Sequence, residues 1–150
     1  MANEHDISVV NSLITTTIDS ANGFERSAED VDAQQHKQLF SQFAQERRQV
    51  VAQLQDYVRS LGGTPNDDGS LKADLHRRWV DLKSLVTGKD EEAILNEAER
   101  GEDVAKERYS EALTKNLPPE IRSMVERQSQ GVLRNHDEVR AMRDVARAKS

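Results

Sequence analysis

The segment GGTPNDDGSLKADLHRRWVDLKSLVTGKD, residues 62–90, separates two helical regions and decides how they connect. Its first residues, Gly62-Gly63, are a strong signal for the end of a helix, and Pro65 prevents that helix from resuming. Apolar residues then recur every three or four positions over residues 71–86, which predicts a short amphipathic helix with Trp79 sealing an end or flank of the core. The segment is therefore a long crossover that carries a helix of its own.

The loop at the start of this crossover resembles part of a calcium site. Asn66-Asp67-Asp68-Gly69-Ser70 offers oxygen ligands, but a calcium loop starting at Asn66 needs a glutamate at its twelfth position, which is Arg77 here. An Asx-rich turn that leads into Ser70 as a helix N-cap is the favoured interpretation.

Two long helices are predicted on each side of the crossover, at Asn3–Val31, Gln34–Leu61, Glu91–Thr114 and Pro119–Ala148. Each has apolar residues three or four positions apart, so these residues form a seam on one helical face. Only short turns separate the helices of each pair, which predicts two antiparallel hairpins. The first two seams are Ile7, Val10, Ile14, Thr17, Ala21, Phe24, Ala28, Val31 and His36, Leu39, Phe40, Phe43, Val50, Leu54, Tyr57, Leu61. The last two are Ile94, Ala98, Gly101, Ala105, Tyr109, Ala112 and Ile121, Val125, Gln128, Val132, Asn135, Val139, Met142, Ala146.

Two residues in the first hairpin do not suit an ordinary helix seam. Gly23 lowers helix stability, so we expect another backbone to pack closely against it. Glu46 lies between Phe43 and Val50, on the apolar face of its helix. Because an unpaired buried charge is costly, we expect Glu46 to pair with an arginine such as Arg47 or Arg48 of a neighbouring helix or subunit.

Composition narrows the class of protein. A chain of 150 residues with 35% apolar and 32% charged residues fits a single domain, 1–150, whose apolar groups lie in narrow stripes. The net charge of −6 argues against a nucleic-acid or anionic membrane surface. The chain has no cysteine, no apolar run long enough to span a bilayer and no secretory signal at its start, so a cytoplasmic location is predicted.

Two antiparallel hairpins joined by one long crossover are the connection of ferritin-like proteins. The sequence thus predicts an all-α, ferritin-like four-helix bundle with a short fifth helix in the crossover. Four stretches lie in order around this crossover: Gly23–Val31, Leu75–Lys83, Glu99–Asp103 and Asn135–Arg140. In this order and around the same crossover, they resemble a bacterial ferritin-like family known only as a domain of unknown function. That resemblance covers nearly the whole chain and implies the bundle fold, but no particular activity.

The usual di-iron motif of this fold is missing. Ferritin-like di-iron proteins hold their metals with paired Glu-x-x-His turns. None of the four histidines has a glutamate three residues before it, where the chain has Ala2, Ala33, Ala73 and Leu133. A standard di-iron centre is therefore not expected, and no catalytic residue is predicted.

Another metal site remains open. Folding the helix pairs about Asp32 and Asn116 brings five candidate ligands toward one end of the bundle: Glu25, His36, Glu99, Glu102 and His136. Carboxylate and imidazole ligands suit iron, manganese or zinc. Small residues at Ala98, Gly101 and Ala105 either allow close helix approach or leave room for ligands.

The alternative is that the five candidates have structural roles. Each lies at the edge of its seam, where charged groups stay solvated or form ion pairs. His36 follows Asp32 by four residues, and His136 has Asp137 and Arg140 nearby.

Two functions follow from these patterns. In the first, the protein is a non-catalytic binding or stress-related accessory protein that forms a homodimer or higher homo-oligomer, with Gln128 and Asn135 fixing helix register through hydrogen bonds. In the second, it is a degenerate ferritin-like metalloprotein that binds iron or another divalent metal, with or without oxidase activity. The basic residues at the C-terminal end are interpreted as a solvated face that complements the helix dipole, with a phosphate or nucleic-acid patch as the alternative. They are Arg134, Arg140, Arg143, Arg147 and Lys149.

Overall fold

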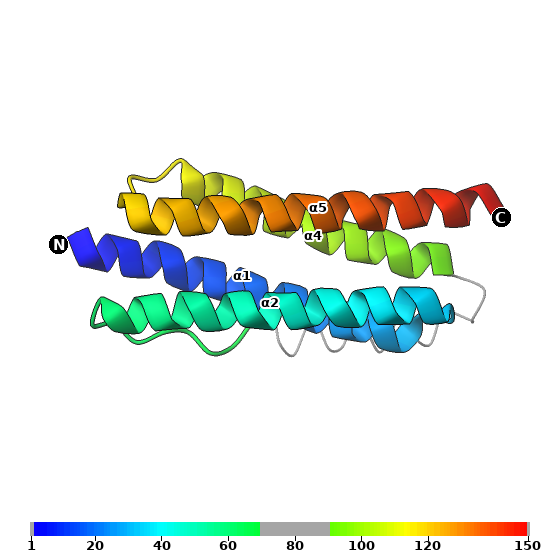
Figure 1. Cartoon of the computed structure of the whole chain (residues 1–150), viewed down its shortest axis with the longest axis horizontal. Coiled ribbons are helices and arrows are strands. Elements are labelled where there is room, and N and C mark those ends of the chain that lie inside the picture. The colour runs from blue at the N-terminus through cyan, green and yellow to red at the C-terminus, as the bar shows by residue number, and fades with distance from the viewer. Residues whose placement is uncertain (1, 70–90, 150) are drawn as a thin grey trace.

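The computed structural model describes residues 2–69 and 91–149, and this part of the chain contains four helices and no strand. The helices are α1 (Ala2–Asp30), α2 (Gln34–Ser60), α4 (Glu91–Leu113) and α5 (Pro119–Lys149). All four lie lengthwise beside one another in a bundle (Figure 1). The predicted all-α four-helix bundle is confirmed. The predicted helix at residues 71–86, Trp79 and the N-cap at Ser70 lie outside the described residues.

The two hairpins are antiparallel, as predicted, and they meet mainly where α1 packs along α4. Helix α2 ends and helix α4 begins at opposite ends of the bundle (Figure 1). The end of α2 has the predicted glycine cap. Gly62 has a φ of 83°, and the Gly63 N–H donates to the Val58 carbonyl at 3.0 Å.

The turn of the second hairpin is closed by an arginine. The Arg122 guanidinium donates to the carbonyl oxygens of Leu113 at 2.9 Å and Lys115 at 2.7 Å. These carbonyls lie at the end of α4, where helix geometry leaves acceptors without a partner in the helix. The start of α5 therefore fixes the end of α4.

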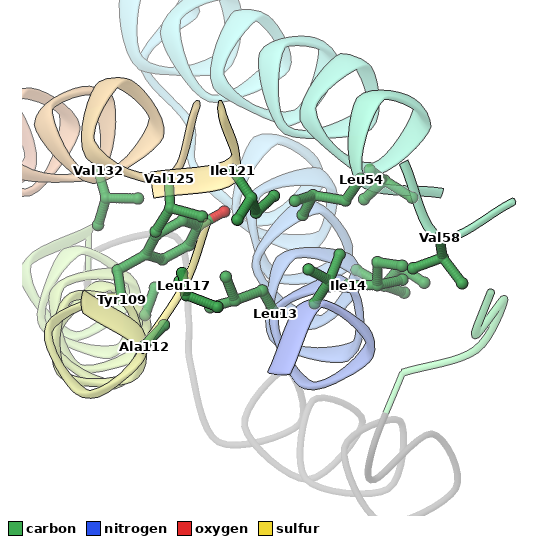
Figure 2. Packing of buried hydrophobic residues seen from close by; sticks show 14 residues of the cluster. Leu13, Ile14, Leu54, Val58, Tyr109, Ala112, Leu117, Ile121, Val125 and Val132 are labelled. Atoms are coloured by element: carbon green, nitrogen blue, oxygen red, sulfur yellow. The ribbon is translucent and has the colours of Figure 1, made fainter. Parts of the chain in front are cut away.

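The buried apolar residues form two clusters near opposite ends of the bundle. Figure 2 shows the first, in which the Tyr109 ring of α4 packs among residues of the turn and of α5. The second contains the aromatic ring pairs Phe24–Phe40 and Phe24–Phe43, with centroids 5.9 and 5.3 Å apart. Between the clusters lies a polar layer of buried residues, Arg47, Glu102, Asn135 and His136.

The predicted seams of α1, α4 and α5 agree with the observed burial except at Gly101, which is exposed. Three predictions for the first hairpin are wrong: the close packing at Gly23, the place of Glu46 and part of the α2 seam. A Cβ atom built on Gly23 would have no other atom of the described residues within 4 Å, so no backbone of that part of the chain packs closely there. Glu46 is exposed and accepts a hydrogen bond from Gln42 Nε2 at 3.4 Å. In α2, Phe40, Phe43 and Leu54 are buried as predicted, but Val51 and Val58 take the places predicted for Val50 and Tyr57. Arg47 is the charged residue on this buried face.

No helix within residues 2–69 and 91–149 combines the length and apolar character that a membrane span requires.

Candidate functional site

Helix α4 places three carboxylates on one stretch of its surface. Glu102 and Asp103 follow Glu99 by three and four residues, so the three side chains leave α4 within about one helical turn. Glu99 and Glu102 are buried and Asp103 is exposed. Buried carboxylates require partners. Both are paired with arginines, Glu102 with one from the other hairpin and Glu99 with two from its own.

Glu102 forms a closed ion pair with Arg47 of the other hairpin. Arg47 Nη1 and Nη2 donate to Glu102 Oε1 and Oε2 at 2.9 and 2.6 Å, and the two side chains are only 4% and 2% exposed. The Arg47 guanidinium also lies over the Phe24 ring, 5.3 Å from its centroid. Burial raises the pKa of the Glu102 carboxyl, while the attached guanidinium opposes that rise. Both carboxylate oxygens are thus occupied by a guanidinium in the buried interior.

Glu99 pairs with arginines of its own hairpin. Arg143 Nη1 donates a hydrogen bond to Glu99 Oε2, and Arg140 Nε lies 3.6 Å from Oε1. The same Oε1 lies 4.0 Å from His136 Nε2. Glu99 therefore links α4 to α5, next to a buried imidazole.

His136 is 1% exposed, and its ring nitrogens contact two carboxylates. Nε2 lies 2.6 Å from Asp103 Oδ1, and Nδ1 lies 3.4 Å from Asp137 Oδ1. Glu99, Asp103 and His136 each offer one ligand atom, and these atoms all lie within 4.8 Å of one another. We call these three residues the edge cluster. In the described part of the chain it is the one group of three or more such side chains that could hold a metal ion.

The five predicted ligands do not form one group. Glu99 and His136 belong to the edge cluster, while Glu102 is engaged by Arg47. Glu25 is exposed and pairs with Arg48 Nη2 at 2.9 Å.

His36 has a structural partner other than the expected Asp32. Its Nδ1 lies 2.8 Å from Glu91 Oε2, while the Asp32 and Ala33 N–H groups donate to the same carboxylate at 2.6 and 3.4 Å. Ala33, the N-cap of α2, cannot cap the helix with its own side chain. The first residue of α4 therefore fixes the turn of the other hairpin.

Two functional candidates were missed from the sequence. Asp103 follows Glu99 by four residues, and this spacing on one helical face was the available signal. Arg47 follows Phe43 by four residues and precedes Val51 by four, so it continues the observed apolar spacing.

The predicted polar seam residues of α5 behave differently from each other. Gln128 accepts a hydrogen bond from the Tyr109 hydroxyl at 3.2 Å and donates to Gln53 at 3.4 Å. Burial raises the pKa of the Tyr109 hydroxyl above its ordinary value of 10.0, partly offset by its contact with Thr17. Asn135 makes no side-chain hydrogen bond with any part of the chain that the structure describes.

The basic end of α5 is more than a solvated face. Arg143 is only 19% exposed where it binds Glu99, and Arg147 Nε lies 2.7 Å from Glu92 Oε1. These arginines tie α5 to α4, so the predicted solvated face is wrong for Arg143.

One solved structure similar to this chain is a two-domain protein from Anabaena variabilis ATCC 29413, with DJ-1/ThiJ/PfpI-like and ferritin-like domains. The TM-score is 0.80, and the match covers 100% of this chain at 11% sequence identity. The chain spans 39% of the length of that protein, and at such identity the likeness shows the fold alone. It identifies the bundle as ferritin-like, as predicted.

No curated protein matches the sequence. A family model described as a domain of unknown function, DUF2383, matches residues 6–115. The predicted membership in a ferritin-like family of unknown function is therefore confirmed, and the chain belongs to the DUF2383 family.

Proposed function

We propose that this protein is a non-catalytic ferritin-like bundle that acts in the cytoplasm as a self-associating binding or stress-related accessory protein. The observation that carries the non-catalytic part is the buried Arg47–Glu102 pair. In di-iron relatives of this fold, inward-facing carboxylates ligate metal. Here Glu102, the most deeply buried carboxylate of the described residues, has both oxygens bound by a guanidinium. A metal ion taking Glu102 would leave Arg47 buried without a partner, at a large cost.

Exposed apolar side chains support self-association. Three large apolar side chains of α4 and α5, Val104, Leu133 and Val145, are 51%, 41% and 55% exposed. A second copy would remove such apolar area from water, which favours association. Mass measured in solution across a dilution series tests this part. A strict monomer at micromolar concentration would remove it.

Metal analysis of protein purified without an affinity tag tests the non-catalytic part. We expect metal far below one equivalent per chain. After anaerobic addition of iron(II) and admission of air, we expect oxidation no faster than in buffer alone. Stoichiometric iron with rapid oxidation would sink the proposal.

A second candidate function is metal binding without a di-iron centre, and the edge cluster favours it. One imidazole and two carboxylates suit manganese, iron or zinc, and the exposed Asp103 leaves the cluster accessible. A bound iron or manganese would supply redox chemistry there. Binding has to displace existing contacts, because Arg143 holds Glu99 and His136 Nε2 contacts Asp103.

The two candidates are separated by one pair of variants. Asp103→Asn removes a charged ligand from the edge cluster. Glu107→Gln removes the same charge from an exposed position one turn further along α4. If the edge cluster binds metal, the affinity falls in the first variant and stays unchanged in the second. Equal affinities in the two variants would eliminate the edge cluster as the site.

A further inference from the structure

A polar groove runs between α2 and α5, which belong to different hairpins. Its volume is about 490 Å³. It shares no residue with the edge cluster, although it opens beside Arg47 of the polar layer. The residues that matter for its chemistry are Arg127, Arg134, Asn135, Gln128 and Glu46, with Val50, Met124 and Val132 as apolar lining.

Asn135 is a buried amide that the fold leaves unused. It is 6% exposed and lines the groove, and its side chain has no hydrogen-bond partner among the described residues. Gln128, one helical turn before it, is fully engaged by Tyr109 and Gln53. An amide side chain carries two donors and an acceptor. The amide atoms of Asn135 are not among the buried side-chain atoms of the described residues that lack a partner, so they reach the solvent of the groove. The Asn135 side chain is thus available to a ligand in the groove.

Arg127 and Arg134 are the second unusual feature. They are seven residues apart on α5, which places them two turns apart on the same side of the helix. Within residues 2–69 and 91–149 they are the two arginines with no hydrogen bond or ion pair. The other described arginines bind carboxylates or carbonyl groups or have another partner, as expected in a chain of net charge −6. Gly131 lies between the two, and a Cβ there would meet nothing closer than Arg134 Nη2 at 3.7 Å.

The charges of the groove limit the ligand it can take. Arg47 is neutralised by Glu102, so the free charges are two guanidinium groups and the Glu46 carboxylate across the groove on α2. The resulting excess of positive charge favours an anion. Planar guanidinium groups match the paired oxygens of phosphate, and the apolar lining suits a carbon skeleton attached to it.

We propose that this groove binds a small organic phosphate monoester. Arg127 and Arg134 contact the phosphate oxygens, and Asn135 contacts a polar atom of the ligand closer to the core. A phosphate monoester would be the ligand of the binding protein proposed above. The site itself is argued from the groove residues, and only its biological role depends on that proposed function.

Calorimetric titration of the full chain in phosphate-free buffer tests the site. The probes are phenyl phosphate and inorganic phosphate. We expect saturable binding of both, tighter for phenyl phosphate because of the apolar lining. In Arg127→Gln/Arg134→Gln, we expect the affinity to fall at least about tenfold because both charge-assisted contacts are lost. The matched control is Arg59→Gln/Arg100→Gln, which removes the same charge from two exposed arginines outside the groove and should keep the wild-type affinity.

Asn135→Leu separates binding from stability. Leucine keeps the approximate size of the side chain but has no donor or acceptor, so phenyl phosphate should bind more weakly while the melting temperature stays close to that of the wild type. Absence of saturable binding by the wild type would overturn the site, as would an equal loss in the control pair or an unchanged affinity in Asn135→Leu. Equal affinity for phenyl phosphate and inorganic phosphate would overturn the claim that the ligand carries an organic group. None of these results alters metal content or iron oxidation, so failure of this site is distinguishable from failure of the proposed function.

Discussion

The Arg47–Glu102 pair and the edge cluster contain carboxylates that are three residues apart on α4, Glu102 and Glu99. The first carboxylate is closed off from solvent by its partner, whereas the second belongs to a cluster that solvent can reach. Glu102 faces the other hairpin and is sealed with its guanidinium, both side chains being at most 4% exposed. Glu99 faces α5, where His136 and the 54% exposed Asp103 form a cluster that solvent reaches. A ferritin-like interior can therefore keep a buried carboxylate without a metal, and the only metal-compatible group in the described residues lies at its edge.

Breaking the sealed pair should have the largest effect. Glu102→Gln leaves the Arg47 guanidinium buried without its counter-ion, and we expect a loss of about 3–5 kcal/mol in unfolding free energy. Denaturant unfolding measures it. Arg47→Met/Glu102→Leu is the control, because a buried pair replaced by apolar residues is often neutral or stabilising. If Glu102→Gln lowers the unfolding free energy no more than the loss of an exposed ion pair does, the interior around Arg47 is open to solvent.

His136→Gln probes the edge cluster in the same way. The contact with Asp103 is lost, but Asp103 regains water, so we expect a smaller loss of about 1–3 kcal/mol. Both losses of unfolding free energy are to be measured under the same denaturant conditions. The difference between Glu102→Gln and His136→Gln then shows how much more the buried pair contributes than the edge cluster. A loss as large as that of Glu102→Gln would contradict the distinction between them.

The pH dependence of Tyr109 measures how well the interior is sealed. Because burial raises its folded-state pKa above the ordinary 10.0, the unfolded chain loses this proton first as the pH rises. The unfolding free energy should therefore fall as the pH rises above the ordinary tyrosine value, up to the folded-state pKa. In Tyr57→Phe, which leaves Tyr109 as the single tyrosine, tyrosinate absorbance should appear only together with loss of helical circular dichroism. Tyrosinate formed while the helices persist would show an open interior.

The exposed Glu25–Arg48 pair should give the smallest effect. Its side chains are 52% and 41% exposed, so we expect Glu25→Gln to cost at most about 1 kcal/mol. Denaturant unfolding in low and high salt checks this, since the cost should shrink as salt screens the pair. A salt-independent loss as large as that of His136→Gln would show that Glu25 has a buried role.

The sequence was sufficient for the topology and for most of the core, because connection lengths and 3–4 spacing depend on local residues. Val10, Ile14 and Phe24 of α1 are buried as predicted. Part of the α2 face was misjudged by one position, since Val50 and Tyr57 fit an apolar spacing almost as well as Val51 and Val58. Burial of an arginine at that face depends on Glu102, a residue 55 positions away.

The candidate site was only partly predictable for the same reason. Counting residues from the turns places His36 and Glu25 at roughly the level of a metal site, but it does not determine which side of the helix faces the core. The contact of His36 with Glu91 arises across the crossover, 55 positions away. Asp103 was overlooked because half-exposed residues do not stand out in a search for buried ligands.

The central claim is that the Glu102 carboxylate forms an ion pair with Arg47 and does not ligate a metal ion. Anaerobic thermal unfolding with a chelator and with excess iron(II), for the wild type and for Arg47→Met/Glu102→Leu, tests it most directly, since a metal that binds the folded state raises its melting temperature. The account predicts that iron(II) changes the melting temperature of both proteins by the same amount. That amount is zero if the edge cluster binds no iron, and otherwise it is the shift that binding at the edge cluster produces. A rise in the wild type that is absent from Arg47→Met/Glu102→Leu would contradict it.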